Sequence, residues 1–147
     1  MAAILRVWDK RVKSEVYSMS DRDAPRPTDA ELEILTIVWH RGPSTVREVH
    51  ENLNKSRGVG YTTVLKFMQI MTDKGLLRRN EEQRAHVYEA TLPQAETQRM
   101  LVGELLDKAF GGSAANLVMQ ALATKPASAE ELSSIRRLLD EYERGSR

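Results

Sequence analysis

The chain of 147 residues contains no cysteine. This absence excludes disulfide bonds, thiolate metal sites and a cysteine nucleophile, and it fits a cytoplasmic protein. No apolar run is long enough to cross a membrane, so we expect no membrane contact. The first eight residues are partly apolar, but Arg6 and Asp9 interrupt this stretch and no small-residue cleavage site follows, which argues against a signal peptide.

Residue patterns typical of catalytic or metal sites are missing too. The three histidines, His40, His50 and His86, are far apart in the predicted elements, and no carboxylate cluster accompanies them at the spacing of metal ligands. The sequence contains neither a Ser/His/Asp arrangement nor a glycine-rich phosphate loop. We therefore expect no enzymatic activity and no cofactor.

The formal net charge of +1 conceals an uneven distribution. Between Lys55 and Tyr88, seven lysines and arginines stand against three acidic residues, a local charge of +4, whereas residues 93–147 carry a charge of −1. A basic segment on a nearly neutral chain is typical of a surface that contacts nucleic acid, although many solvent-exposed faces are basic as well.

The amino-terminal stretch has no clear hydrophobic period. We expect residues 1–24 to be a poorly ordered extension, followed by an extended linker at Pro25-Arg26-Pro27. Because Met19 can serve as a start of its own, we interpret residues 1–18 as the product of an upstream start codon. The sequence leaves open whether the natural protein contains them, and its intact mass tests this interpretation.

Two capping boxes predict the first two helices of a helix-turn-helix. Thr28-Asp29-Ala30-Glu31 begins one helix, in which the Thr28 hydroxyl and the Glu31 carboxylate bond each other's amides, and Gly42-Pro43 ends it. Thr45-Val46-Arg47-Glu48 begins a second, shorter helix. Apolar residues at helical spacing are expected to form the core: Leu32, Leu35, Val38, Trp39, Val46, Val49 and Leu53.

The segment from Gly60 to Gly75 is predicted to be a third helix with two distinct faces. The polar face begins with hydroxyl side chains at the end that a recognition helix directs at base edges. The alternative is an ordinary amphipathic core helix with a solvated face. Val64, Phe67, Met68 and Met71 form the apolar face, and Thr62, Lys66, Gln69 and Asp73 form the polar one.

Two antiparallel strands, over residues 76–80 and 84–90, are predicted after this helix, with a short polar turn between them. A β-hairpin directly after a recognition helix is a wing, and Arg79 and Arg84 near its tip would neutralise phosphates. The alternative is a structural cap on the core. The order of three helices and a hairpin favours nucleic-acid binding and predicts a winged helix-turn-helix domain over residues 25–92.

Residues 93–147 are predicted to form three more helices, over 97–110, over 114–123 and after a capping box at Ser128. They are too few and too short to bury their apolar faces alone, so we expect a dimerisation region that packs against a second subunit. The fold class is therefore mostly α with a small β-hairpin. The expected dimer contacts are Leu101, Leu105, Phe110, Leu117, Val118, Leu122, Leu132, Ile135, Leu139 and Tyr142.

A two-fold dimer suits double-stranded DNA, because it repeats the recognition helix over a palindromic operator. Ser44 and Thr45, at a helix N-terminus, would hold a phosphate through hydroxyl and amide groups. The remaining expected contacts divide into two groups. Tyr61, Thr62, Thr63 and Lys66 would enter the major groove, and Gln69, Arg78, Arg79 and Arg84 would contact phosphates.

Four motifs together resemble the penicillinase-repressor family, the BlaI/MecI group, over about residues 28–142. They are Trp39-His40-Arg41-Gly42-Pro43-Ser44-Thr45-Val46, Gly60-Tyr61-Thr62-Thr63-Val64, Asp73-Lys74-Gly75-Leu76-Leu77-Arg78-Arg79 and Phe110-Gly111-Gly112-Ser113. The resemblance implies a homodimeric winged-helix repressor that binds a palindromic operator and dimerises through its helical carboxy-terminal region. In this family a membrane-bound sensor protease, triggered by a β-lactam, often leads to cleavage in the dimerisation region and loss of repression.

Two departures limit what the resemblance implies. Inducible members have an Asn-Phe cleavage pair in the helix after the Gly-Gly break, whereas this chain has Gln120-Ala121, so the resemblance does not extend to cleavage at that bond or to a β-lactam response. The copper-responsive branch has a cysteine-rich metal site, which a chain without cysteine cannot form. The operator, the regulated genes and the inducing signal stay open.

Two other functions are compatible with the sequence. A winged helix can serve as a protein-binding adaptor without DNA contact, and Leu65 and Ile70, beside the polar face, would then form an apolar patch. A DNA-binding sensor with a small-molecule pocket between its domains is the second alternative.

Overall fold

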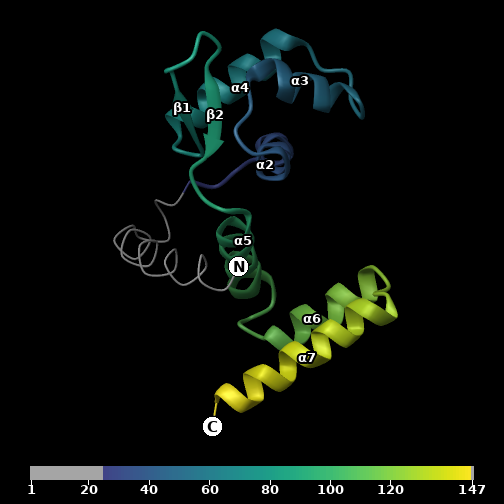
Figure 1. Cartoon of the computed structure of the whole chain (residues 1–147). Helices are drawn as coiled ribbons and strands as arrows, with labels where there is room; N and C mark the ends of the chain where they lie inside the picture. The colour runs from purple at the N-terminus through teal and green to yellow at the C-terminus, as the bar shows by residue number, and fades with distance from the viewer. Residues whose placement is uncertain (1–24, 147) are drawn as a thin grey trace. The chain divides into compact units, whose positions relative to one another are not determined.

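The computed structural model describes residues 25–146, so the predicted disordered extension over residues 1–24 lies outside the described residues. The chain divides into two compact units after Glu96. Figure 1 shows the order of the elements, which is α2 (Asp29–Arg41), α3 (Val46–Asn54), α4 (Tyr61–Asp73), β1 (Leu77–Asn80), β2 (Val87–Ala90), α5 (Gln94–Ala109), α6 (Ala114–Thr124) and α7 (Ala129–Gly145). The fold class predicted from the sequence is confirmed.

The first two predicted capping boxes begin helices. The Thr28 hydroxyl accepts a hydrogen bond from the Glu31 amide at 3.3 Å, and the Thr45 hydroxyl accepts one from the Glu48 amide at 3.2 Å. Gly42, with a φ of 89°, ends α2 and donates its amide to the Val38 carbonyl at 2.8 Å. A left-handed residue at this position is the usual way to end a helix, and glycine adopts it without strain.

The Glu31 carboxylate has a different role from the one predicted. Its oxygen accepts the Thr28 hydroxyl at 3.0 Å, and both of its oxygens accept the Lys74 ammonium, at 2.6 and 3.0 Å. The Glu31 side chain is only 3% exposed, whereas that of Lys74 is 37% exposed. A partly buried ion pair therefore joins the first turn of α2 to the residue that follows α4.

One hydrophobic core lies between the three helices and the hairpin. The apolar faces predicted for the helices contribute most of it, and Trp39, Leu65 and Phe67 pack against it while partly buried. Close-packed interiors of this kind fix the relative positions of the elements that contribute to them. The buried residues are Ile34, Leu35, Val38, Val46, Val49, Leu53, Val64, Met68, Met71, Leu76, Leu77 and Tyr88.

The predicted hairpin is present, but its second strand is shorter than expected. β1 and β2 pair antiparallel, with Leu77 opposite Ala90 and Asn80 opposite Val87. The prediction that a strand begins at Arg84 was therefore wrong, because residues 81–86 form the loop between the strands. Ser44 adds an isolated bridge to Tyr88, with amide-to-carbonyl distances of 3.0 and 2.8 Å, which joins the hairpin to the segment between α2 and α3.

The three helices predicted for residues 93–147 are present, and α5 begins at Gln94, slightly earlier than expected and just before the second unit. The Ser113 hydroxyl accepts from the Asn116 amide at 3.2 Å, and the Ser128 hydroxyl accepts from the Glu131 amide at 3.1 Å, so both predicted serine caps are confirmed. In the described part of the chain, neither α6 nor α7 contains a buried residue. Their apolar faces therefore lie at the surface of this unit.

We predict that replacing Lys74 by Met lowers the free energy of unfolding by about 2–3 kcal/mol, because the buried Glu31 carboxylate loses its counter-ion. Adding Glu31→Gln should recover part of the loss, since a neutral amide needs no counter-ion. Urea unfolding measures both effects. The matched control is Arg57→Met, whose partner Glu33 is 48% exposed, and it should cost less than about 1 kcal/mol. Equal losses for Lys74→Met and Arg57→Met would contradict the prediction.

Candidate nucleic-acid interface

Helix α4 presents its polar face to solvent, as the sequence predicted. Val64, Met68 and Met71 are fully buried on the opposite side, and this burial fixes the rotation of the helix about its axis. Tyr61, in the first turn, is 47% exposed. The exposed residues along the polar face are Thr62, Thr63, Lys66, Gln69 and Asp73.

The N-terminus of α4 differs from those of the other helices for which a capping residue is known. Gly60 precedes it and supplies no side-chain hydrogen bond, and its first turn contains no acidic residue. By contrast, threonine or serine side chains cap α2, α3, α6 and α7. The amide groups at a helix N-terminus carry partial positive charge and attract anions. The uncapped end of α4 is therefore compatible with a nearby phosphate.

Two of the predicted phosphate-binding arginines already have acidic partners. Arg78 donates to Glu89 across the hairpin at 2.9 Å, and Arg79 donates to Glu81. Hydrogen bonds with Tyr88 and Glu81 raise the pKa of Arg79. An incoming phosphate has to compete with these carboxylates.

Lys66 and Arg84 differ from these arginines. Both side chains are exposed, and neither forms an ion pair with any of the residues 25–146. Lys66 lies on the polar face of α4, and Arg84 lies in the loop between β1 and β2. These two cations can meet a phosphate without first losing a partner.

The structure does not support the predicted phosphate contact of Ser44. Ser44 is only 1% exposed, and its hydroxyl donates to the Gly42 carbonyl at 2.9 Å. Its amide is also occupied, because it donates to the Tyr88 carbonyl. Ser44 therefore holds the hairpin in place and has no free donor for a ligand.

Thr45 is half-buried, and its hydroxyl donates to the Glu48 carboxylate at 3.1 Å. The hydrogen bond from Arg41, with a further one from Thr45, lowers the pKa of Glu48. An ionised carboxylate thus already lies at the N-terminus of α3, where the sequence predicted a phosphate.

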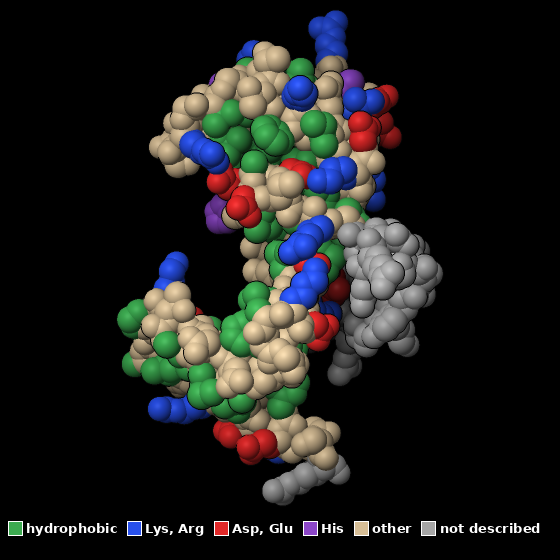
Figure 2. Space-filling model, turned by 180° about the vertical axis from the view of Figure 1, so that it is seen from behind, with side chains coloured by type: hydrophobic (Ala, Val, Ile, Leu, Met, Phe, Trp, Pro, Cys, Tyr) green, Lys and Arg blue, Asp and Glu red, His purple; other side chains and the backbone are tan. Residues whose placement is uncertain are grey.

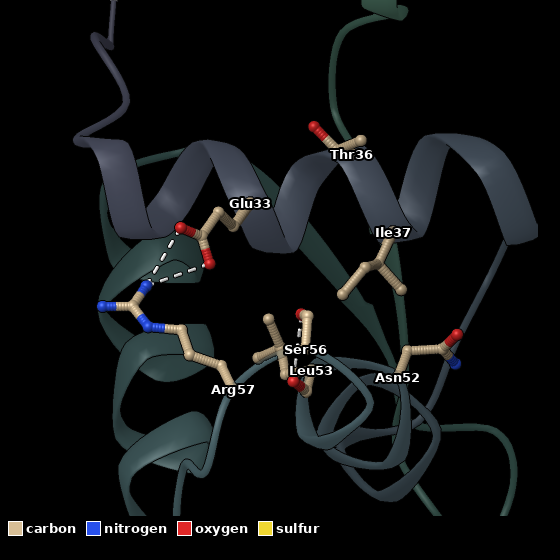
Figure 3. A pocket seen from close by; sticks show the side chains of 7 residues that line it. All are labelled: Glu33, Thr36, Ile37, Asn52, Leu53, Ser56 and Arg57. Carbon is tan, nitrogen blue, oxygen red and sulfur yellow. Dashed lines mark hydrogen bonds and ion pairs between the residues drawn. The ribbon is translucent and has the colours of Figure 1, made fainter.

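An open hollow lies between α2 and the end of α3 (Figure 3). Arg57 closes one side of it with hydrogen bonds of 2.9 and 3.1 Å to the two carboxylate oxygens of Glu33. Three other polar side chains in its wall, those of Thr36, Asn52 and Ser56, donate to backbone carbonyls. The lining residues are Glu33, Thr36, Ile37, Asn52, Leu53, Ser56 and Arg57.

Among residues 25–146, no group of three His, Cys, Asp or Glu side chains is arranged to hold a metal ion. No helix in this part of the chain has both the length and the apolar character needed to cross a membrane.

Comparison with known proteins identifies the family. The sequence model of the family described as "Penicillinase repressor" matches residues 27–141. The penicillinase repressor of Bacillus licheniformis is 24% identical over 118 residues, which are 80% of this chain and 92% of that protein. The transcriptional regulator BlaI of Mycobacterium tuberculosis is 30% identical over 118 residues, 80% of this chain and 85% of that protein.

The solved structures that are similar to this chain include the monomeric form of Bacillus licheniformis BlaI in complex with the blaP half-operator. It aligns at 26% identity with a TM-score of 0.45, over 50% of this chain and 89% of that chain. The family match extends over most of the sequence, including the motifs at residues 60–64 and 73–79 on which the predicted resemblance rested. The chain belongs to the penicillinase repressor family.

Proposed function

We propose that this chain acts as a homodimer that binds a palindromic operator with α4 and the β1–β2 hairpin. Membership of the penicillinase repressor family makes it a DNA-binding transcriptional repressor and not an enzyme. We further propose which residues bind DNA and how two copies associate. We also propose that the protein acts in the cytoplasm, where its operator would be.

The two-faced geometry of α4 carries the proposal. Its buried side fixes the helix on the core, and its exposed side offers hydroxyl, amide and ammonium groups next to an uncapped N-terminus. Such groups can bind base edges and phosphates in a major groove. We assign base contacts to Tyr61, Thr62, Thr63 and Lys66, and phosphate contacts to Gln69, Arg78, Arg79 and Arg84.

The hairpin would supply a sequence-independent part of the affinity. Arg84 needs no rearrangement to reach a phosphate, whereas Arg78 and Arg79 have to exchange carboxylate partners for it. Exposed pairs of this kind contribute little to stability, so the exchange costs little. We therefore expect Arg84 to contribute most clearly to the salt dependence of binding.

The apolar surface of the second unit supports the dimer. Figure 2 shows hydrophobic side chains gathered on this unit, and among the residues predicted to dimerise Tyr142 is 71% and Leu139 57% exposed. Large exposed apolar patches mark interaction sites. We propose that α5, α6 and α7, within residues 93–147, pack against the same helices of a second copy.

The signal that ends repression could come from a sensor protease, but the site of cleavage would differ from that of inducible relatives. A membrane-bound sensor protease is a partner typical of the family, and the region around Gln120 and Ala121 is exposed on α6. Because these residues replace the cleavage pair of inducible relatives, we do not propose cleavage at their bond.

The adaptor alternative has one residue in its favour. Leu65 packs against the core and is partly buried, whereas Ile70 is 41% exposed. A single exposed isoleucine beside Lys66 and Gln69 is a small apolar area, so the polar face favours DNA. The hollow of Figure 3 does not support a small-molecule sensor with a pocket between its domains, because all the lining residues belong to the first unit.

Replacing Arg84 by Ala should weaken binding to all duplexes about equally and lower the slope of log affinity against log salt by about one. The measurement is a salt titration of binding to a duplex that the wild-type protein selects from a random pool, here called the selected duplex. Arg57→Ala is the matched control, because it removes the same charge from an exposed arginine that is not among the proposed DNA contacts, and its slope should not change. An unchanged slope for Arg84→Ala would show that Arg84 does not touch phosphate.

Replacing Leu139 by Asp should convert a dimer into monomers. Each copy of a two-fold interface would lose a buried leucine. The free energy of dimerisation should therefore weaken by about 3 kcal/mol or more, which raises the dimer Kd roughly a hundredfold. Sedimentation measures the change, and Ser133→Asp, which adds the same charge elsewhere on α7, should leave the dimer intact. A wild-type protein that is monomeric at micromolar concentration would refute this part of the proposal.

A further inference from the structure

The turn between α3 and α4 decides where the recognition helix begins, and it contains two glycines. Neither Gly58 nor Gly60 has a positive φ, so the backbone here does not require glycine. Glycine therefore adds freedom to this turn instead of fixing it. Because Gly60 also provides no side-chain cap, the start of α4 has to be held by other residues.

Both backbone groups of Val59, inside this turn, are held by side chains from α3. The Val59 amide donates to Asn54 Oδ1 at 3.0 Å. The Val59 carbonyl lies 2.8 Å from Nε2 of His50, one helical turn before Asn54. These two side chains thus bind the residue immediately before the N-terminal glycine of α4, from both sides of its backbone.

The proton on Nε2 of His50 decides which of its two contacts is a hydrogen bond. Nε2 lies 2.8 Å from the Val59 carbonyl oxygen and 2.9 Å from Nδ2 of Asn54, whose Oδ1 accepts from the Val59 amide. A single ring nitrogen cannot donate to Val59 and accept from Asn54 at the same time. We take the tautomer with the proton on Nε2, in which both backbone groups of Val59 are hydrogen-bonded to side chains of α3.

The same imidazole ring contacts Tyr61. The two ring centroids are 5.8 Å apart and the planes meet at 84°, an edge-to-face arrangement. Tyr61 lies in the first turn of α4, and half of its side chain is exposed. His50 therefore supports both the backbone before the helix and the first side chain expected to enter the major groove.

We propose that His50 and Asn54 are positioning residues for operator recognition. They bind Val59 and support Tyr61, and in this way they set the direction in which α4 presents its polar face, without touching DNA themselves. This inference rests on the proposed function, because it concerns how the same surface discriminates between DNA sequences. It predicts that their loss impairs discrimination more than it impairs general affinity for DNA.

The test compares full-length His50→Leu and His50→Gln with the wild-type protein. We measure the ratio of affinities for the selected duplex and for an unselected random duplex. His50→Leu should lower this ratio about tenfold while random-duplex affinity stays nearly constant. His50→Gln should retain most of the ratio, because its amide can donate to the Val59 carbonyl. His40→Leu, the same change at an exposed histidine, is the control and should have no effect.

A second measurement tests the hydrogen bonds of His50 and Asn54 to Val59, here called the clamp, without any DNA. In Asn54→Ala the Val59 amide loses its acceptor, so its hydrogen exchange should accelerate about tenfold while amides in the centre of α4 keep their protection. Unchanged exchange at Val59 would overturn the clamp, whatever the protein binds. Equal losses for both duplexes in His50→Leu, or a His50→Gln protein as poor as His50→Leu, would overturn the positioning role. A wild-type protein without duplex preference would instead refute the proposed function, and the positioning role with it.

Discussion

The position of α4 depends first on the buried carboxylate of Glu31. This group accepts two hydrogen bonds from Lys74 and one from Thr28, and so joins the carboxy-terminal end of α4 to the start of α2. A buried charge of this kind is costly unless its partner stays in place, which makes the contact selective for one arrangement of the two helices. The buried methionines of α4 and the bonds to Val59 fix the rest of the helix, and its polar face is left at the surface.

The two units of the chain differ in how they meet the need to bury apolar surface. The first has a core in which side chains from three helices and a hairpin are fully enclosed. The second has regular helices with several large apolar residues that stay exposed within one copy, including Leu139 and Tyr142. Helices of this type gain most of their stability from packing of their apolar faces. A second copy would supply that packing, so association and a two-fold arrangement of recognition helices would have one physical cause.

The parts of this structure that depend on neighbouring residues could be predicted from the sequence. The caps at Thr28, Thr45, Ser113 and Ser128 follow from local hydrogen bonds, and the two faces of α4 follow from helical spacing. The family could also be identified, because its motifs lie at characteristic spacings along one chain.

The contacts that depend on distant residues could not be predicted in the same way. Glu31 meets Lys74 across 43 positions, and Ser44 pairs with Tyr88 through the tertiary fold, which removes it from the expected phosphate contacts. The interface itself is most directly tested by competition binding of wild-type protein and Lys66→Ala to the selected duplex and to random duplex. We predict that the wild-type protein prefers the selected duplex by about a thousandfold or more, and that Lys66→Ala loses about 1–3 kcal/mol of this preference. Equal binding of the wild-type protein to both duplexes, or an unchanged preference in Lys66→Ala, would contradict the account.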